Sequence, residues 1–343
     1  MRLAILTFAF LTSIPGAVLV CTQQLELTTL KDEVRPVIAQ SSPSPTPVIQ
    51  QRRDENDVIR VDTNLISIPA TVMDRDGRYI TDLRKEDFQI FEDGVEQQVV
   101  LFEPVEQPFT ILFLLDVSGS MGYRMDELAH AANAFISQLR PDDWLTAISF
   151  ADFPWVLFHS TRISDLGKGI KIQQRRDQTT TMVYDAVDDA LNRTRKIKGR
   201  KAIVLFSDGA GGGIFASAKG NLHKAEEQDA LIYTVQFALP TEPPRHVDRK
   251  YYVGRIGQIN AYMKDLAQKT GGRHYKIEQI SDLETTFGLV ADELRRQYSL
   301  GYYPKKRLEA GQQRQIKVKV RLPNLVVRAR DSYTVDKDHL KGK

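Results

Sequence analysis

The chain has 343 residues, enough for two domains, and 42% of them are hydrophobic, as in ordinary globular proteins. Its 47 basic and 44 acidic residues nearly balance, so the charge gives no reason to expect a nucleic acid as a partner. Cys21 is the single cysteine, which excludes an intrachain disulfide and a cysteine-based zinc cluster.

An apolar stretch covers residues 3–20 and predicts a signal peptide or an N-terminal anchor over residues 1–21. Cys21 follows this stretch directly, as in lipoproteins, but Val20 is larger than the residue that such sites prefer, so lipidation stays open. Residues 22–57 are rich in proline and serine and poor in large apolar side chains, which predicts a disordered linker. We therefore expect an exported protein, located in the periplasm, the cell envelope or outside the cell.

Two segments, residues 58–107 and 298–335, alternate apolar and polar side chains with the period of two that is typical of half-buried strands. Each offers only a few short strands, and small isolated sheets are marginally stable. We therefore predict that both segments pair into one small β-sandwich, with the intervening residues inserted between its halves and residues 336–343 as a tail. The strands expected here are 65–72, 87–94 with its turn, 97–102, 298–303, 315–320 and 325–330.

Residues 108–297 alternate apolar strands with helical patterns, which predicts an α/β domain with a doubly wound, mostly parallel sheet of the Rossmann-like kind. Strands are expected at 111–115, 144–151, 155–159, 203–207, 231–239 and 273–277. Helices are expected at 124–139, 183–191, 261–270 and 281–297. Ser281 and Glu284 have the spacing of a capping box at the start of the last helix.

Two loops and a group of acids in this part allow more than one interpretation. Residues 240–257 are basic and aromatic, and form either a partner-binding insertion or a solvated loop. Residues 209–213 are rich in glycine but lack the lysine of a phosphate-binding loop, so a mobile loop is expected. Asp185, Asp188 and Asp189 lie near the start of the second helix, and we expect them to be solvated or to favour its dipole.

The strand at 111–115 runs straight into the sequence Asp116-Val117-Ser118-Gly119-Ser120. Five consecutive large apolar residues are typical of a parallel strand that is buried on both faces. Ligands of open α/β sheets bind where such strands end, at the carboxyl edge. A carboxylate and two hydroxyls are hard oxygen donors, which suit Mg²⁺ or Ca²⁺ better than zinc. The sequence therefore predicts a metal site that uses Asp116, Ser118 and Ser120.

The segment 116–120 resembles the first loop of the metal-ion-dependent adhesion site of von Willebrand factor type A domains. In that family a threonine on a second loop and an aspartate on a third loop complete the site. Thr181 matches the threonine by its spacing to the following helix, although Thr180 is an alternative, because three threonines stand where the family usually has glycine-threonine. Asp208 follows the strand at 203–207 and matches the aspartate. The resemblance thus implies Mg²⁺, with Mn²⁺ or Ca²⁺ as alternatives, at Asp116, Ser118, Ser120, Thr181 and Asp208.

Residues 81–94 and the tail pattern LGYYP…IKVKV…VRAR are also similar to bacterial proteins related to this family, among them proteins of acidobacteria. The resemblance implies an exported, non-enzymatic module for adhesion or assembly, whose metal coordinates an acidic side chain of a protein partner. The balanced charge gives no reason to expect a nucleic-acid partner, and contact with a membrane is expected only through the apolar N-terminal segment. The alternatives are a metal-dependent hydrolase that uses the same site, although no Gly-x-Ser-x-Gly elbow exists, or a structural scaffold with a vestigial site.

Overall fold

The computed structural model describes residues 65–103, 107–119, 125–167, 169–173, 180–240, 242–243 and 245–337. The predicted signal peptide or anchor, the predicted linker, Ser120 and most of the predicted tail lie outside these residues. The chain divides into a unit of residues 1–59 and a unit of residues 60–343, and every element below belongs to the second unit. None of the helices in the described part is both long and apolar enough to cross a membrane.

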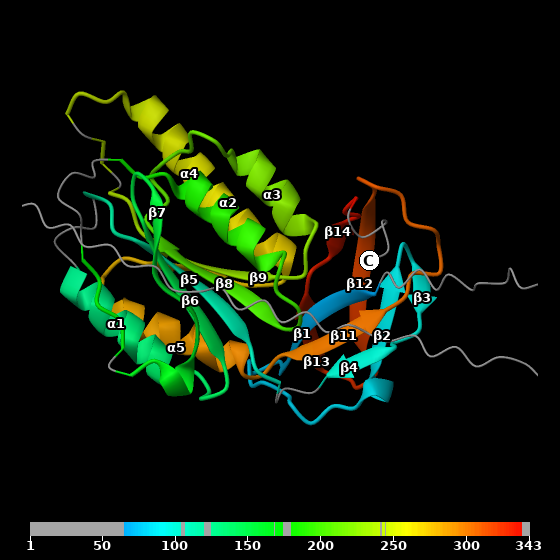
Figure 1. Ribbon diagram of the computed structural model, residues 1–343. Helices are drawn as coiled ribbons and strands as arrows, with labels where there is room; N and C mark the ends of the chain where they lie inside the picture. Colours follow the sequence, from blue (N-terminus) through cyan, green and yellow to red (C-terminus); the bar gives the residue numbers. More distant parts are fainter. Residues whose placement is uncertain are drawn as a thin grey trace, which may run out of the picture. The chain divides into compact units, whose positions relative to one another are not determined.

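The central sheet has six strands in the order β10-β9-β8-β5-β6-β7, of which β7 alone runs antiparallel to its neighbour (Figure 1). The predicted doubly wound, mostly parallel sheet is therefore confirmed. After β5 the chain builds β6 and β7 on one side and then returns to build β8, β9 and β10 on the other. Ligands of open α/β sheets bind at such a reversal of strand order. The strands are β5 Thr110–Asp116, β6 Trp144–Phe150, β7 Pro154–Arg162, β8 Lys201–Ser207, β9 Leu231–Phe237 and β10 His274–Ile277.

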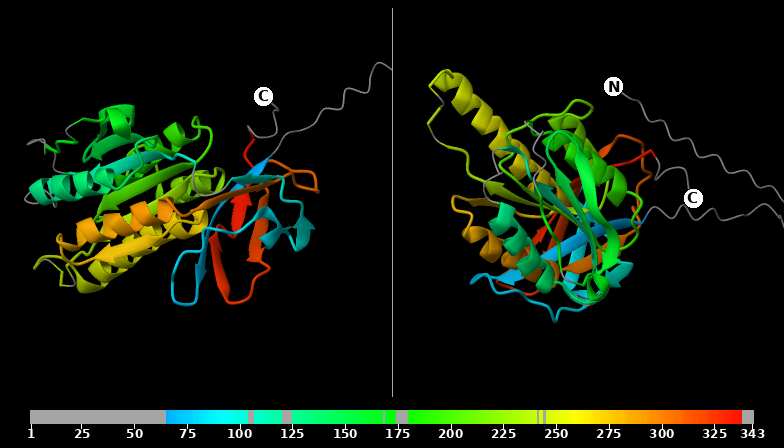
Figure 2. Two further views of the ribbon diagram at one scale, coloured as in Figure 1. Left: turned by 90° about the horizontal axis from the view of Figure 1, so that it is seen from below. Right: turned by 60° about the vertical axis from the view of Figure 1, so that its left-hand side comes forward.

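Helices cover both faces of this sheet (Figures 1 and 2). Along β5 the side chains alternate: Phe113 packs into the core under α1 and α5, whereas Leu112 and Leu114 pack into the core under α2, α3 and α4. The uninterrupted apolar run of β5 exists because both faces are covered, and each such side chain stabilises the fold by about 1.5–3 kcal/mol. The helices are α1 Met125–Ser137, α2 Val183–Thr194, α3 Ala218–Glu226, α4 Arg249–Thr270 and α5 Asp282–Leu294.

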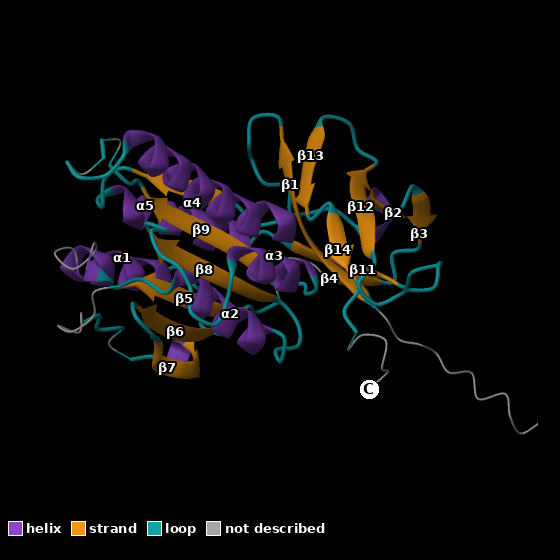
Figure 3. Cartoon of the chain, turned by 90° about the horizontal axis from the view of Figure 1, so that it is seen from above, coloured by secondary structure: helices purple, strands orange, loops and turns teal. Residues whose placement is uncertain are grey.

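Two four-stranded antiparallel sheets form a further β region, with the orders β13-β1-β11-β4 and β14-β12-β2-β3 (Figure 3). Each sheet combines strands that precede the α/β part in the sequence with strands that follow it, since β1 pairs with β11 and β2 pairs with β12. The two sheets share one apolar core, to which Ile68, Ile90 and Leu300 contribute. The predicted β region built from two distant segments is confirmed. Its strands are β1 Ile66–Asp74, β2 Phe88–Glu92, β3 Val95–Gln97, β4 Leu101–Glu103, β11 Tyr298–Tyr302, β12 Gln313–Val320, β13 Leu325–Ala329 and β14 Ser332–Thr334.

Several element predictions were wrong. Residues 97–102 do not form one strand, because the chain passes there from β3 in one sheet to β4 in the other. The helix expected at 261–270 begins at Arg249, where Asp248 caps it by accepting a hydrogen bond from the Tyr251 N–H. Ser281 makes no capping hydrogen bond, since its own backbone is already helical. Helix α3 and strand β14 had no counterpart in the sequence prediction.

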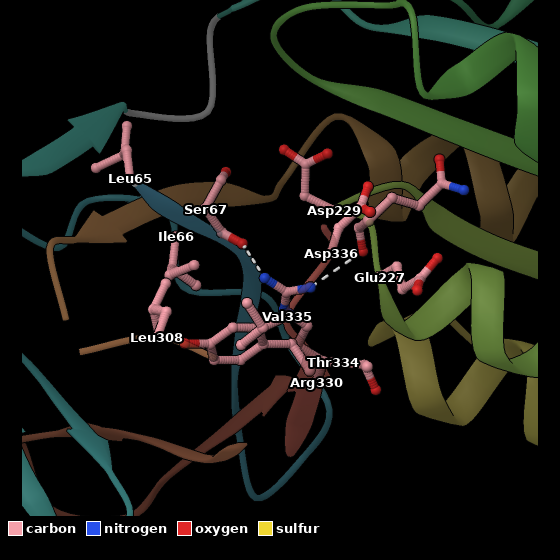
Figure 4. A pocket seen from close by; sticks show the side chains of 12 residues that line it. Leu65, Ile66, Ser67, Glu227, Asp229, Leu308, Arg330, Thr334, Val335 and Asp336 are labelled. Atoms are coloured by element: carbon pink, nitrogen blue, oxygen red, sulfur yellow. Dashed lines mark hydrogen bonds between the residues drawn. The ribbon is translucent and has the colours of Figure 1, made fainter. Parts of the chain in front are cut away.

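Buried arginines join the β region to the α/β part. Arg330 follows β13 and donates hydrogen bonds to the carbonyls of Ser67 (2.7 Å) and Gln228 (3.0 Å), at the side of a small cavity (Figure 4). Arg200 donates to the carbonyls of Gln107 (2.7 Å) and Gln297 (2.6 Å), where the chain enters and leaves the α/β part. These bonds satisfy carbonyls that would be costly to bury without a partner.

Candidate metal-ion site

Asp116 is the last residue of β5, and its side chain is fully buried. Its Oδ1 accepts a hydrogen bond from the Ser118 N–H (2.9 Å), as short polar side chains do where a strand turns into a loop. Its Oδ2 accepts a hydrogen bond from the Ser207 hydroxyl (2.5 Å) at the end of the neighbouring strand β8. Both oxygens are therefore fixed, so the carboxylate has a defined orientation at the carboxyl edge of the sheet.

Asp208 follows Ser207 directly, and its side chain is also buried. Its Oδ1 accepts a hydrogen bond from the Ala210 N–H (2.8 Å). Between them, Gly209 adopts a φ of 73°, which favours glycine, and a Cβ there would lie 2.7 Å from a methyl group of Ile259 on α4. The third loop can therefore turn against α4 because this position is glycine.

The electrostatics of this edge are those of a site prepared for a cation. Burial, and after it the negative charge of Asp208, raise the pKa of Asp116 to about 7, although hydrogen bonds from Ser118 and Ser207 oppose the rise. Two neighbouring carboxylates in a desolvated place repel each other, and a divalent cation relieves that repulsion. The carboxylates of Asp116 and Asp208 and the hydroxyl of Ser118 fit the oxygen preference of Mg²⁺.

The second loop, which precedes α2, brings Thr180 and Thr181 to the carboxyl edge of the sheet. The hydroxyl and the N–H of Thr180 both donate to Oδ1 of Asp152 (2.5 and 2.8 Å), so this hydroxyl is engaged in the turn after β6. Thr181 is half-buried and lines a cavity together with Thr180, with Gly119 of the first loop and with Ala210 of the third. Because Asp152 engages the Thr180 hydroxyl, Thr181 is the better candidate for the predicted ligand.

The glycine-rich third loop is anchored rather than loose, in contrast to the mobile loop that we expected. The N–H of Gly212 donates to the Thr181 carbonyl (3.0 Å), and a Cβ at Gly211 would lie 2.3 Å from that carbonyl oxygen. The Asp185 carboxylate accepts hydrogen bonds from the N–H groups of residues 214–216 at 2.8–3.1 Å. Asp185 lies in the first turn of α2, where it favours the helix dipole as expected, but it also fastens the third loop to α2.

The structure thus places Asp116, Ser118 and Asp208 at the ends of adjacent strands, and Thr181 on the second loop, where it lines a cavity with residues of the first and third loops. Ser207, which orients Asp116, was missed by the sequence analysis. Its position directly before Asp208 was the available signal, but a buried serine has no pattern that distinguishes it. Within the described ranges, no cluster of three or more His, Cys, Asp or Glu side chains could hold a metal. The predicted set is of another kind, with two carboxylates and otherwise hydroxyls.

Comparison with protein families matches residues 111–210 to the model of the von Willebrand factor type A domain, a range that contains all five predicted ligands. No curated protein matches the chain. Among solved structures, BatB from Bacteroides thetaiotaomicron is 16% identical, with a TM-score of 0.39, over 55% of this chain and 97% of that one. The ArnB paralog VWA2 from Sulfolobus acidocaldarius is 13% identical, with a TM-score of 0.40, over 81% and 78%. The proximal thread matrix protein 1 from the mussel byssus, with a zinc-occupied MIDAS motif, is 11% identical, with a TM-score of 0.42, over 60% and 50%.

Proposed function

Because the chain contains a von Willebrand factor type A domain, we propose that it is a metal-dependent protein-binding module for adhesion or assembly. The observation that carries this proposal is the meeting of two buried carboxylates, Asp116 and Asp208, at the carboxyl edge where the strand order reverses. Such a pair is costly to hold in the folded protein unless a cation lies beside it.

Mg²⁺ is the proposed cofactor, with Mn²⁺ or Ca²⁺ as alternatives. Ser118, Ser120 and Thr181 would supply neutral hydroxyl ligands, and Asp116 and Asp208 would supply charge, through bound waters. Mg²⁺ keeps several waters in protein sites, so it would offer an exchangeable position to a carboxylate oxygen of the partner. Two protein carboxylates do not exceed the charge of the divalent cation, so the bound metal still attracts the carboxylate of a partner.

The proposal assigns no catalysis to this site. A hydrolase that uses a serine of this site as its nucleophile would need an activated hydroxyl that a substrate can reach. The Ser207 hydroxyl, which donates to the Asp116 carboxylate, is fully buried, so a substrate cannot reach it. Turnover of ester, peptide and phosphate substrates with Mg²⁺ distinguishes the two functions. A rate that Ser118→Ala abolishes would establish the hydrolase instead.

We also propose that the protein is exported, because the apolar residues 3–20 and the Pro/Ser-rich segment after them have the pattern of an export signal and a tether. Cell fractionation tests the location, and full-length protein in the cytosol would contradict it. Palmitate labelling that disappears in Cys21→Ala would establish a lipoprotein.

The metal proposal is tested by thermal melting and calorimetric titration with Mg²⁺, Mn²⁺ and Ca²⁺. A metal that binds only the folded state stabilises it by about 2.7 kcal/mol at a hundredfold excess over the dissociation constant. We expect such a gain for the wild type and little gain for Asp116→Ala. A scaffold with a vestigial site would show no metal-dependent rise in Tm. Pull-downs from envelope extract, with Mg²⁺ and with chelator, then test for a partner.

A further inference from the structure

The largest exposed apolar side chains gather at one edge of the sheet. In the described part of the chain, the four most exposed large hydrophobic residues are Phe215 (86%), Tyr251 (63%), Ile214 (62%) and Phe153 (61%). All four lie in segments that follow the carboxyl ends of the parallel strands β6, β8 and β9. This is the edge that carries Asp116, and exposed apolar side chains concentrated beside a polar site are typical of a protein-binding surface.

The first ten residues of α4, Arg249–Gln258, are unusual for a helix because none of them is buried. This half of α4 reaches beyond α2 (Figure 1). It contains Gly254 and Gly257, where an added Cβ would meet nothing within 4 Å, although glycine weakens a helix by about 1 kcal/mol per residue. Helical stability in proteins comes mainly from packing of an apolar face, so an exposed, glycine-weakened half-helix gains stability when a partner covers it.

Arg255 connects this half-helix to the candidate metal site. It lines the cavity that Gly119, Thr181 and the third loop share, and its guanidinium donates a long hydrogen bond to the Gly211 carbonyl (3.4 Å). It also lines a second cavity on α4, together with Lys250, Tyr251 and Gly254. The carboxylate in that second cavity, Asp248, is engaged in capping the helix. An anion that reaches from one cavity into the other therefore meets two cations.

Resting on the proposed function, we propose that Arg255 and Lys250 form a second subsite, which binds a second acidic side chain of the same partner segment. The first acid of this segment binds the metal. The exposed Tyr251, which lines the second cavity, receives a large apolar side chain next to the acids. The partner is thus an extended protein segment that carries two acidic residues and a large apolar residue. Helix α4 favours such a segment over one that carries a single acid.

The test measures fluorescence anisotropy of labelled peptides of equal length in millimolar Mg²⁺. One peptide carries a single aspartate, and the others carry two acids at varied spacing, with and without phenylalanine. We expect the best two-acid peptide to bind the wild type about tenfold more tightly than the single-acid peptide, the ratio that one charge-assisted hydrogen bond supplies. Arg255→Gln and Lys250→Gln should reduce this ratio towards one. Lys264→Gln is the matched control, because Lys264 is exposed on the same helix but lines neither cavity.

Hydrogen exchange provides a second readout, since the two-acid peptide should protect the first half of α4 and the single-acid peptide should not. If single-acid peptides bind in Mg²⁺ but the ratio is unchanged in Arg255→Gln and Lys250→Gln, the second subsite is wrong and the proposed function stands. If no peptide binds the wild type in Mg²⁺, both are wrong. Binding to vesicles of phosphatidylglycerol that is independent of Mg²⁺ and lost in Lys250→Gln would make α4 a membrane-binding element instead.

Discussion

The Ser207 hydroxyl donates a 2.5 Å hydrogen bond to Oδ2 of Asp116 and accepts one from the Gly209 N–H at 2.8 Å. This single hydroxyl therefore links the end of β5 to the loop that carries Asp208. It fixes the carboxylate of Asp116 and the turn of the third loop together.

We predict that Ser207→Ala weakens Mg²⁺ binding by about tenfold to a hundredfold, because a hydrogen bond to a charged group contributes about 1.5–3 kcal/mol. Loss of this bond also raises the pKa of Asp116 further, so protons compete more strongly with the metal at neutral pH. Calorimetric titration measures the effect. Ser149→Ala is the matched control, since Ser149 is equally buried on β6 and its hydroxyl has no hydrogen-bond partner among the described residues. Equal affinities for the two variants would contradict the prediction.

The raised pKa of Asp116 predicts how stability depends on pH. In metal-free protein the folded pKa is about 7 and the unfolded value is 3.8, so between these values the folded state binds more protons than the unfolded state. The free energy of unfolding should therefore fall as pH rises from about 4 to 7, by as much as about 4 kcal/mol. Denaturant unfolding in the presence of a chelator measures this slope.

Two comparisons sharpen the pH prediction. Asp116→Asn should remove the slope, because an amide does not titrate. Saturating Mg²⁺ should reverse it in the wild type, because deprotonation of Asp116 then favours metal binding to the folded state. A slope that is the same in the wild type and in Asp116→Asn would mean that another group causes it.

Much of the candidate site at the carboxyl edge of the central sheet was predictable, because it depends on local sequence. The apolar run of β5 reflects burial on both faces; Asp116 ends this strand, and Asp208 directly follows β8. Ser207 was not predictable, since its role exists only once β5 and β8 are neighbours. The three threonines left two candidates, and only the position of Asp152, which binds Thr180, distinguishes them.

The missed helices have a common physical reason. Periodicity predicts a helix when one of its faces is buried, and the first half of α4 buries none. Helix α3 is short and mostly polar, and its apolar face is small: only Ala218, Leu222 and Ala225 pack against the core. The capping signals were also ambiguous: Asp248 caps its helix, whereas Ser281 does not.

The contact between Asp185 and the third loop supports a prediction about stability. Asp185→Ala leaves three backbone N–H groups of residues 214–216 without their acceptor and should lower the free energy of unfolding by about 1–3 kcal/mol. Amide exchange should accelerate in these residues. In Asp189→Ala, the control, the lost partner is Arg193 in a surface pair, so the cost should be about 0.5 kcal/mol. If both variants unfold alike, Asp185 does not anchor the loop.

The junction between α5 and β13 supports the last prediction. Glu293 of α5 is fully buried, accepts a hydrogen bond from the Tyr233 hydroxyl (2.7 Å) and pairs with Arg328 of β13. Arg328→Met leaves this carboxylate buried without its cation, which should lower the free energy of unfolding by about 3–5 kcal/mol. Adding Glu293→Gln to Arg328→Met should recover most of the loss, because the uncompensated charge is then gone.

Denaturant unfolding of the two single variants and the double variant measures this coupling as a double-mutant cycle. Arg296→Met is the control, since Arg296 pairs with Asp292 at the surface and its loss should cost at most about 1 kcal/mol. Additive effects of Arg328→Met and Glu293→Gln would show that the two side chains do not compensate each other. Non-additivity would mean instead that the β region neutralises a charge inside the α/β part, so that α5 depends on β13 for its stability.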